Sequence, residues 1–451
     1  GELPPTAGSV NVRPELTSDR SHFCVLHQPK PWVRREQYTP RRAAISAFGF
    51  GGINAHVLLE EWTSARAQQL DAETHDPSLP HLDEPVAIVG LGGQYGRWTD
   101  PQSLTERMLG YRDSSHAPQR IGEWDGYPFQ QLHLDRLKFR IPPRELEQLL
   151  PQQALMLQTA ANAMDDAGLP AKAGRHVLTG VFIGIGLDLN TTNFHARWSA
   201  EQQIDVWNNR FELNLSAEDR KHLVEELRRS AGPYLNADRT MGALGGIVAS
   251  RVARWIGAGA SSFTLSCEEN SGLKALEVAL RSLRRGEINL ALVGGVDLNA
   301  EPRSLLAQHM LAGEKNAASF GEGAGALVLK RQSDAQHDGD RIYCLVKGAG
   351  HASGHLDGGS GDTLDTDAYG QSFEQALTDA NVGATSISLV DVTDRCCHDD
   401  PKHELAWLAE SFHDKRRHHR CALSHSRDLL GHTGAACGIA GLQRAALCLH
   451  H

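Results

Sequence analysis

Short apolar runs alternate along most of this chain with segments whose apolar positions recur every three or four residues. Runs that are apolar at nearly every position are typical of strands covered on both faces. Such runs lie at residues 86–90, 177–186, 262–265, 288–296, 321–329 and 343–348. Segments with the helical period lie at residues 143–168, 240–256, 271–285, 372–380, 403–412 and 434–450. This alternation predicts a layered α/β fold.

The start of the chain follows a different pattern. Residues 1–62 begin with a proline-rich extended stretch and reach a glycine-rich turn at 49–56, after which a strand is expected. Residues 63–83 are polar, lack an apolar period and are interpreted as a linker. The sequence therefore predicts three parts: a segment at 1–62, a linker at 63–83 and a body at 84–451.

Composition narrows the classes of function. The 451 residues carry a formal net charge of -10, with 40% hydrophobic and 22% charged residues. This balance is ordinary for a globular protein and argues against a nucleic-acid surface, which would need a basic patch. No apolar run reaches the length of about 18 residues that a membrane-spanning helix needs. The first five residues, GELPP, also lack the pattern of a signal peptide.

The cysteines are few and irregularly spaced. Eight cysteines in a chain of this length do not suggest a disulfide framework and favour a reducing, cytoplasmic location. The densest spot is Cys396-Cys397-His398, which lacks the separated pairs of a structural zinc site. We interpret it as a loop and expect no metal.

Six segments together resemble the β-ketoacyl synthase family, in the form found in polyketide and polyunsaturated-fatty-acid synthases. They lie at residues 84–93, 143–168, 292–296, 321–325, 430–436 and 49–56. The resemblance covers nearly the whole chain except the linker. It implies a thiolase-like α/β fold, in which two stacked βαβαβαββ halves form αβαβα layers.

One of these segments is out of order. In the family, the turn that resembles residues 49–56 follows the helix that here ends the chain. Residues 1–62 are then either the C-terminal tail of an upstream ketosynthase or a circularly permuted part of one domain. In both readings we expect them to pack on the body as its final strands, because a body without them would expose a sheet edge.

The resemblance also locates the expected active site, and the nucleophile is not there. An active ketosynthase carries a cysteine at a strand-to-helix elbow, where the helix start lowers the thiol pKa. Matching Thr264 and Leu273 to the family pattern puts Glu269 at the nucleophile position. Cys267 falls two residues earlier, on the strand side, and is the alternative nucleophile.

The other catalytic positions are only partly kept. Val392 stands at the position of the first histidine, and His398, the nearest histidine, is displaced by six residues. His432 keeps the second histidine position, and Arg427 stands where the family has a lysine. One hypothesis is that an ion pair between Arg427 and Glu269 fills the pocket.

The turn at 49–56 resembles the family's gate to the acyl pocket, which puts Phe50 and Asn54 at that gate. If residues 1–62 belong to an upstream ketosynthase, these two residues describe that domain's pocket.

Three functions follow from the resemblance. The favoured one is a non-catalytic, chain-length-factor-like partner domain, which pairs with an active ketosynthase or with itself and shapes the acyl-chain tunnel. The alternative is an active condensing enzyme that uses Cys267 and His432. A decarboxylase without condensing activity would need both histidines, and Val392 argues against it. No cofactor is expected, since the parent synthase's substrates are carried on the phosphopantetheine of an acyl carrier protein.

Overall fold

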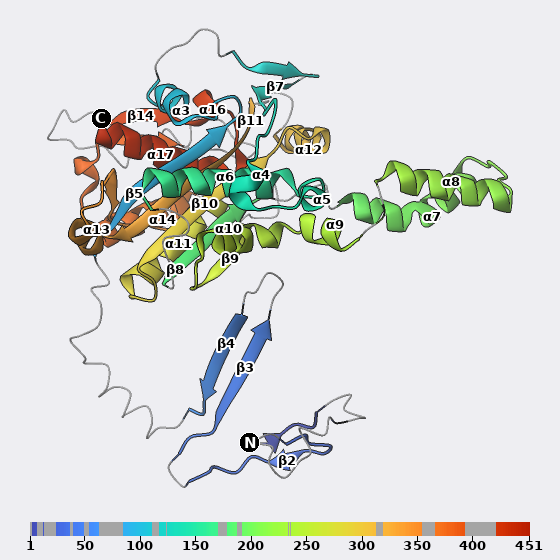
Figure 1. The fold of residues 1–451 in the computed structure, drawn as a ribbon, viewed down its shortest axis with the longest axis horizontal. Coiled ribbons are helices and arrows are strands. Elements are labelled where there is room, and N and C mark those ends of the chain that lie inside the picture. Colours follow the sequence, from blue (N-terminus) through green and yellow to red (C-terminus); the bar gives the residue numbers. More distant parts are fainter. Residues whose placement is uncertain are drawn as a thin grey trace. The chain divides into compact units, whose positions relative to one another are not determined.

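The computed structural model describes the chain in ordered segments (Figure 1). The described residues are 2–6, 12, 24–36, 39–48, 54–62, 84–110, 117–122, 124–169, 178–186, 192–232, 234, 236–312, 319–353, 366–392 and 421–451. They belong to two compact units, Gly1–Leu79 and Pro80–His451, which are treated separately below.

The first unit consists of two small antiparallel pairs. β1 (Glu2–Leu3) pairs with β2 (Lys30–Pro31), and β3 (Arg42–Phe48) pairs with β4 (Asn54–Glu60). The strand expected after the glycine-rich turn is therefore present as β4, and β3 is its partner.

The β3–β4 hairpin has one apolar face and one mixed face, which also carries the Arg42–Glu60 ion pair and the Ser46–His56 hydrogen bond. Ile45 pairs with Val57 on one face, and Ala44 pairs with Leu58 on the other. Within the unit, Ile45, Val57 and Leu58 are 55%, 50% and 81% exposed. Antiparallel strands with one apolar face normally pack that face against a core. The docking of residues 1–62 on a ketosynthase-like body stays a prediction.

The second unit is built on an eight-stranded mixed sheet. Its strands are β5 (Val86–Tyr95), β6 (Gln119–Ile121), β7 (Trp124–Tyr127), β8 (Thr179–Ile185), β9 (Ser262–Leu265), β10 (Leu290–Leu298), β11 (Phe320–Arg331) and β12 (Cys344–Val346). The main path runs β12-β5-β11-β10-β8-β9, and the short β6–β7 pair joins β11. β10, β8 and β9 are parallel, whereas β12, β5, β11 and β10 are successively antiparallel.

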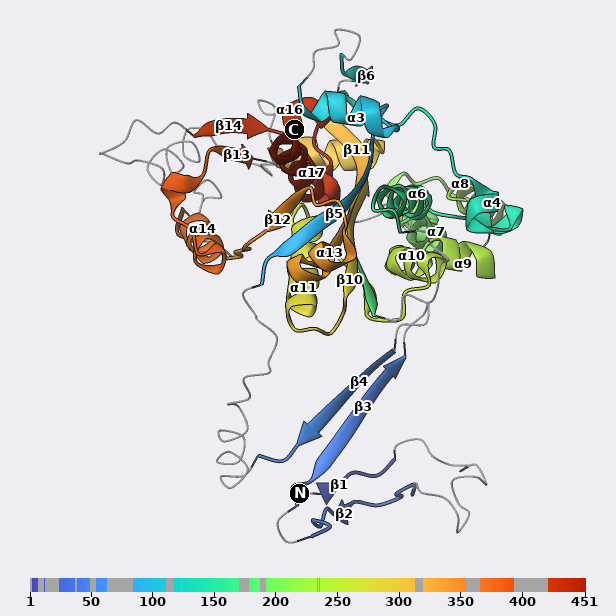
Figure 2. The same ribbon diagram turned by 60° about the vertical axis from the view of Figure 1, so that its left-hand side comes forward.

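Helices cover both faces of this sheet (Figure 2). α6 (Pro151–Asp166) and α10 (Val248–Ile256) pack on one face, and α11 (Ser271–Arg284) and α17 (Cys437–His450) pack on the other. The side chains of each strand alternate between the two cores. On β8, Val181 joins the core under α6 and α10, whereas Phe182 joins the core under α11 and α17. This explains the uninterrupted apolar runs of the sequence.

The remaining elements surround this layered core. They are α3 (Pro101–Met108), α4 (Arg136–Phe139), α5 (Pro143–Leu146), α7 (Thr192–Arg210), α8 (Ala217–Ser230), α9 (Ala237–Gly242), η2 (Gly245–Ile247), α12 (Pro302–Ala312), α13 (Gln332–Asp338), α14 (Thr366–Ala380), η3 (Ala384–Ser386), β13 (Leu389–Val392), β14 (Ala422–His425), α16 (Arg427–Leu430) and η4 (Gly434–Ala436). None of the described helices is both long and apolar enough to cross a membrane.

Two predicted helices are interrupted. The segment at 143–168 forms α5 and then α6, because Leu150 is extended and Pro151, which cannot donate a backbone hydrogen bond, starts a new helix. The segment at 240–256 contains the end of α9, then η2 and α10. The helix predicted at 403–412 lies outside the described residues.

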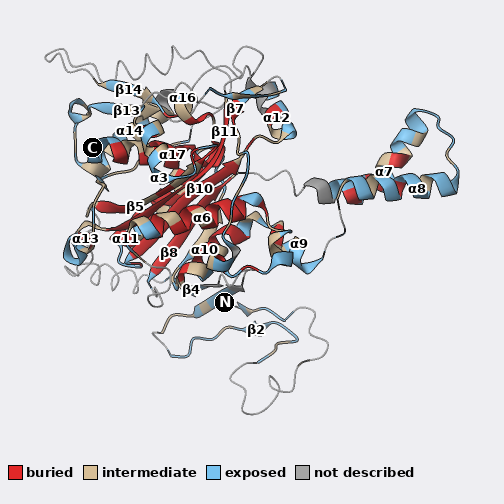
Figure 3. Ribbon diagram, turned by 45° about the horizontal axis from the view of Figure 1, so that its top comes forward, coloured by how far each residue is buried: buried red, intermediate tan, exposed pale blue. Residues whose placement is uncertain are grey.

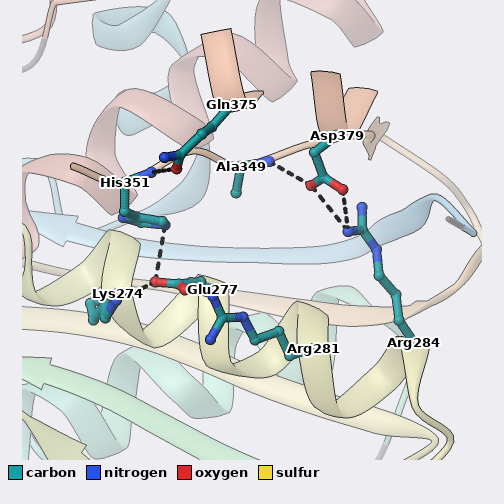
Figure 4. Close-up of polar contacts among 8 residues, drawn as sticks. All are labelled: Lys274, Glu277, Arg281, Arg284, Ala349, His351, Gln375 and Asp379. Carbon is teal, nitrogen blue, oxygen red and sulfur yellow. Dashed lines mark hydrogen bonds and ion pairs between the residues drawn. The ribbon is translucent and has the colours of Figure 1, made fainter. Parts of the chain in front are cut away.

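A polar network around the buried Glu277 and Arg284 ties α11 to the chain after β12 and to α14 (Figure 4). Glu277, on α11, receives a hydrogen bond from Lys274 at 2.5 Å and pairs with Arg281 and with His351 Nε2, the latter at 3.2 Å. Burial lowers the pKa of His351 against the opposing charge of Glu277. A second ion pair, Arg284–Asp379 at 2.9 Å, joins the same elements. The network therefore links α11 to the chain after β12 and to α14 through side-chain contacts.

One packing constraint yields a direct test. Gly184 of β8 lies so close to the start of α11 that a Cβ there would be 2.5 Å from the Ser271 carbonyl carbon and 2.6 Å from the Gly272 nitrogen. We expect Gly184→Ala to lower the free energy of unfolding by about 1–3 kcal/mol, as overpacking does. The matched control is Gly246→Ala, whose new methyl would meet its nearest atom at 3.8 Å. Urea denaturation measures both variants, and equal midpoints would contradict the constraint.

Candidate functional site

The strand-to-helix elbow is a tight turn between β9 and α11. Glu268 has a φ of 50°, in the left-handed region that residues with a Cβ seldom adopt. The Ser271 hydroxyl closes the turn, since its Oγ accepts from the Cys267 amide at 2.8 Å and donates to the Glu268 carbonyl at 2.5 Å. Glu269 thereby precedes Asn270, the N-cap residue of α11. An anion at this place is favoured by the positive end of the helix dipole.

The Glu269 carboxylate faces the imidazole of His432. Their Oε1 and Nε2 atoms are 3.7 Å apart, and the side chains are 27% and 11% exposed. His432 Nδ1 accepts a hydrogen bond from the Gly434 amide at 3.1 Å, so it carries no proton. In the neutral ring the proton therefore lies on Nε2, the atom that faces Glu269. The carboxylate thus lies on the Nε2 side of the ring.

The backbone of His432 is held by the start of β11. Its amide donates to the Ser319 carbonyl at 2.9 Å, and its carbonyl accepts from the Gly321 amide at 2.8 Å. Gly431 and Gly434, on either side, have φ values of 75° and 48°, which favour glycine. The histidine position is therefore preorganised by the fold.

Asp297, at the end of β10, is a site residue that the sequence analysis missed. Its Oδ2 accepts from the Ala435 amide at 3.0 Å and supports the first turn of η4, which leads into α17. Burial raises the pKa of Asp297 from 3.8 to about 6, and the negative charge of Glu269 contributes to the rise, while the Ala435 hydrogen bond and His432 oppose it. The sequence did contain a signal for this residue. Asp297 is a carboxylate that directly follows residues 292–296, one of the six segments that resemble the family.

Two cysteines lie in or near the elbow. Cys267 is exposed and lies on the strand side of the elbow, two residues before Glu269. Cys437, which the sequence analysis did not single out, is buried at the start of α17, and its Sγ lies 3.3 Å from the Glu269 carbonyl oxygen. This contact ties the backbone of the elbow to α17.

The first-histidine position is part of a structural element. Val392 is half-buried, ends β13 and pairs in register with His425 of the parallel strand β14. The preceding residue, Asp391, accepts a hydrogen bond from Ser426 and pairs with Arg444 at 3.2 Å. Position 392 therefore supplies an apolar side chain with no acid–base capacity. His398 lies outside the described residues, as do Cys396 and Cys397.

The two remaining predictions concern Arg427 and the gate. Arg427 is the first residue of α16, and the structure gives the Glu269 carboxylate a partner in His432. The proposed pair of Arg427 with Glu269 stays a prediction. Phe50 lies outside the described residues, and Asn54 is placed only as the first residue of β4.

The buried carboxylate predicts a specific pH dependence. Because Asp297 holds its proton up to about pH 6 in the folded state but only to about pH 4 when unfolded, stability falls as the pH rises through that interval. The loss is at most about 3 kcal/mol, from two units of pKa. Asp297→Asn keeps an acceptor for the Ala435 amide but cannot become charged. Its free energy of unfolding should therefore rise relative to that of the wild type as the pH increases from 4 to 6.

Urea denaturation at several pH values measures this difference. The control is Glu225→Gln, which removes an exposed carboxylate on α8. A difference between Asp297→Asn and the wild type that stays constant from pH 4 to 7 would show that Asp297 does not titrate as stated.

Comparison of the sequence with known families gives two adjoining matches. The N-terminal domain of β-ketoacyl synthases matches residues 83–335, and the C-terminal domain matches residues 343–451. These two ranges leave out the first 82 residues and a short joint between the domains.

Individual relatives include large synthases. The chain is 27% identical to polyketide synthase GfsB of Streptomyces halstedii over 82% of its length, and 26% identical to polyketide synthase PksM of Bacillus subtilis over 83%. It is 26% identical, over 100% of its length, to one of the subunits of a polyunsaturated fatty acid synthase from a Thraustochytrium species. The chain spans only 7%, 9% and 22% of these proteins, respectively.

Solved structures show the same fold. The structure titled PfaC Keto synthase-Chain length factor matches with a TM-score of 0.74 and 22% identity, over 94% of this chain and 45% of that one. The ketosynthase from module 6 of the bacillaene synthase of Bacillus subtilis matches with a TM-score of 0.62 and 25% identity, over 81% and 61%. The predicted thiolase-like α/β fold is thereby confirmed.

Proposed function

The chain belongs to the β-ketoacyl synthase family, and from this premise we propose that its body, residues 84–451, is a non-catalytic ketosynthase-like partner domain. In a fatty-acid or polyketide synthase it would pair with an active ketosynthase and shape the tunnel that receives the growing acyl chain. The observation that carries the proposal is the Glu269 carboxylate ahead of α11, directed at His432.

The chemistry of condensation needs a group that this position does not supply. A thiolate accepts an acyl chain from the carrier's phosphopantetheine by thioester exchange, whereas a carboxylate would form a reactive mixed anhydride. Glu269 also lies in front of the Nε2 atom of His432. The proton on this nitrogen would otherwise face a substrate carbonyl. With Val392 in place of the first histidine, two of the three catalytic groups are replaced.

The alternative, condensation by Cys267, has less support. Cys267 is exposed, and its amide is used by Ser271 to close the turn. The residue lies before the strained Glu268 rather than at the helix start, where a thiol gains most from the helix dipole. A third possibility, decarboxylation alone, lacks the first histidine in the same way.

Residues 1–62 are proposed to act as closing strands of a ketosynthase-like body. Two observations support this role: the β3–β4 hairpin has an apolar face with exposed side chains, and the Thraustochytrium relative aligns with the whole chain in its linear order. In this role Phe50 and Asn54 would lie at the gate of the acyl pocket of the body that they complete.

Substitution at the elbow tests the loss of catalysis. We expect the wild type and Cys267→Ser to show equal, background levels of condensation with acyl- and malonyl-carrier proteins. A double variant, C267S with E269C, places a thiol at the helix start and should be alkylated by iodoacetamide at position 269, as peptide mapping would show. It should still not condense, because Val392 supplies no acid–base group. Condensation by the wild type that is lost in Cys267→Ser would establish the alternative.

Pairing is tested separately. When the active ketosynthase of the same synthase is mixed with the full chain, we expect a 1:1 complex in analytical ultracentrifugation. We also expect the distribution of product chain lengths to shift relative to the ketosynthase alone. The C267S variant should produce the same shift, because the proposed role needs the shape of the domain and not a thiol. Unchanged products in the presence of a formed complex would contradict the tunnel-shaping role.

A further inference from the structure

Residues 347–351, which follow β12, form a strap that contacts both α11 and α14 (Figure 4). On the side of α14 the contact is between backbones. A Cβ on Gly348 would lie 2.5 Å from the Ala376 carbonyl oxygen, and a Cβ on Gly350 would lie 1.9 Å from the Ser372 carbonyl oxygen. The two glycines therefore let the strap and α14 pack as one piece.

Side chains join this piece to α11. The Ala349 amide donates to Asp379 of α14 at 2.9 Å, and Asp379 pairs in turn with Arg284 of α11 at 2.9 Å. The His351 amide donates to Gln375 of α14 at 3.1 Å. The imidazole of the same residue faces α11. Position 351 is thus bound to one helix by its backbone and directed at the other by its side chain.

The helix α14 has little buried surface of its own. Each of its residues from 368 to 380 is half-buried or exposed, whereas the strands of the central sheet are largely buried (Figure 3). Segments with few buried apolar contacts are the ones that open locally in a native protein. The attachment of the strap and α14 to α11 therefore depends strongly on the polar contacts between them.

His351 lies against a carboxylate that already has two cationic partners. The Glu277 side chain is only 7% exposed, receives a hydrogen bond from Lys274 at 2.5 Å and pairs with Arg281. His351 Nε2 is 3.2 Å from Glu277 Oε2. This nitrogen is buried, and in the described part of the chain it has no aligned hydrogen bond. The imidazole is therefore poorly solvated in this position.

His351 is the member of this cluster whose charge changes near neutral pH. Lysine and arginine keep their charge between pH 5 and 8, whereas histidine titrates within that range. Burial lowers the pKa of His351 from its ordinary value of 6.5; Glu277 opposes this shift, and Lys274 and Arg281 add to it. The charged groups that face the strap in the described part of the chain are Lys274, Glu277, Arg281 and Arg284 on α11 and Asp379 on α14.

We propose that His351 makes the strap acid-sensitive: when its imidazole takes up a proton, the strap and α14 separate from α11. In the closed state Glu277 is already paired with Lys274 and Arg281, so a third cation beside it gains less than it loses by leaving water. In the open state the imidazolium is hydrated, and Glu277 keeps its two partners on α11. This conformational device goes beyond the proposed function and does not rest on it.

Closure of the strap weakens as the pH falls. Because His351 is protonated less readily in the closed state, closure is fully favoured above pH 6.5 and is lost progressively below it. Opening takes up one proton, so the ratio of closed to open chains falls by at most ~10-fold per pH unit. Asp297 has the opposite sign, since its pKa is raised. A measurement that is local to the strap separates the two residues.

Hydrogen exchange followed by mass spectrometry on the full chain gives this local measurement, because the Ala349 and His351 amides are held by α14. Exchange of a peptide spanning residues 347–353 is compared at pH 7.5 and 5.5 with that of the same peptide in isolation, which corrects for the intrinsic pH dependence. From the higher to the lower pH we expect protection to fall by about 3–10-fold. A peptide from β8, in the central sheet, should show no such fall.

Three variants identify the titrating group. His351→Gln should make the protection of the strap independent of pH over this range. Lys274→Gln removes a positive charge beside the imidazole, so protonation in the closed state becomes easier and the fall should be smaller than in the wild type. The Lys274 side chain is 40% exposed, so this variant tests the proposal even if His351→Gln does not fold. His222→Gln removes an exposed histidine on α8 and should behave as the wild type.

Equal protection of the strap at the two pH values in the wild type would overturn the proposal. The same fall in His351→Gln as in the wild type would also overturn it, since another group would then be titrating. A larger fall in Lys274→Gln would show that the charges on α11 act on the strap in the opposite sense. The condensation and pairing tests of the proposed function leave all of these outcomes unchanged.

Discussion

The candidate site is held together by the close approach of backbone to backbone between the central sheet and two helix starts. On β8, Gly184 lets the first residues of α11 come into contact with the strand, and on β10, Gly295 does the same for Ala435 in η4. Any side chain at either glycine would push one helix start outward and separate Glu269 from His432. Because protein interiors are close-packed, the positions of the two helix starts depend on this backbone packing and not on which residue stands at the elbow.

Different residues at the elbow are therefore compatible with the same fold. Glu269 is an anion at the positive end of a helix, as a thiolate would be, so the local electrostatics of the elbow are preserved. Asp297 supports η4 from beneath through the Ala435 amide and does not depend on the elbow residue for that contact. The catalytic positions can therefore change while the packing that surrounds them is kept.

The layered fold and the position of Glu269 could be predicted from the sequence, for related reasons. Val181 and Phe182 face different cores, so a strand buried on both sides produces a local, readable run of apolar residues. The elbow is equally local, since a strand, a turn and a helix follow one another within a few residues. The strand order and the role of Asp297 depend on partners distant in sequence, which a single sequence does not indicate.

The surroundings of Glu269 illustrate the same limit. The proposed pair with Arg427 stays a prediction, and the sequence did not indicate that the carboxylate lies beside a histidine whose Nδ1 is engaged by a backbone amide. With Nδ1 fixed as an acceptor, Nε2 must be a donor, and a half-buried donor needs an acceptor in front of it. The Glu269 carboxylate lies 3.7 Å from this atom, so it places a negative charge on the side of the ring from which the proton points.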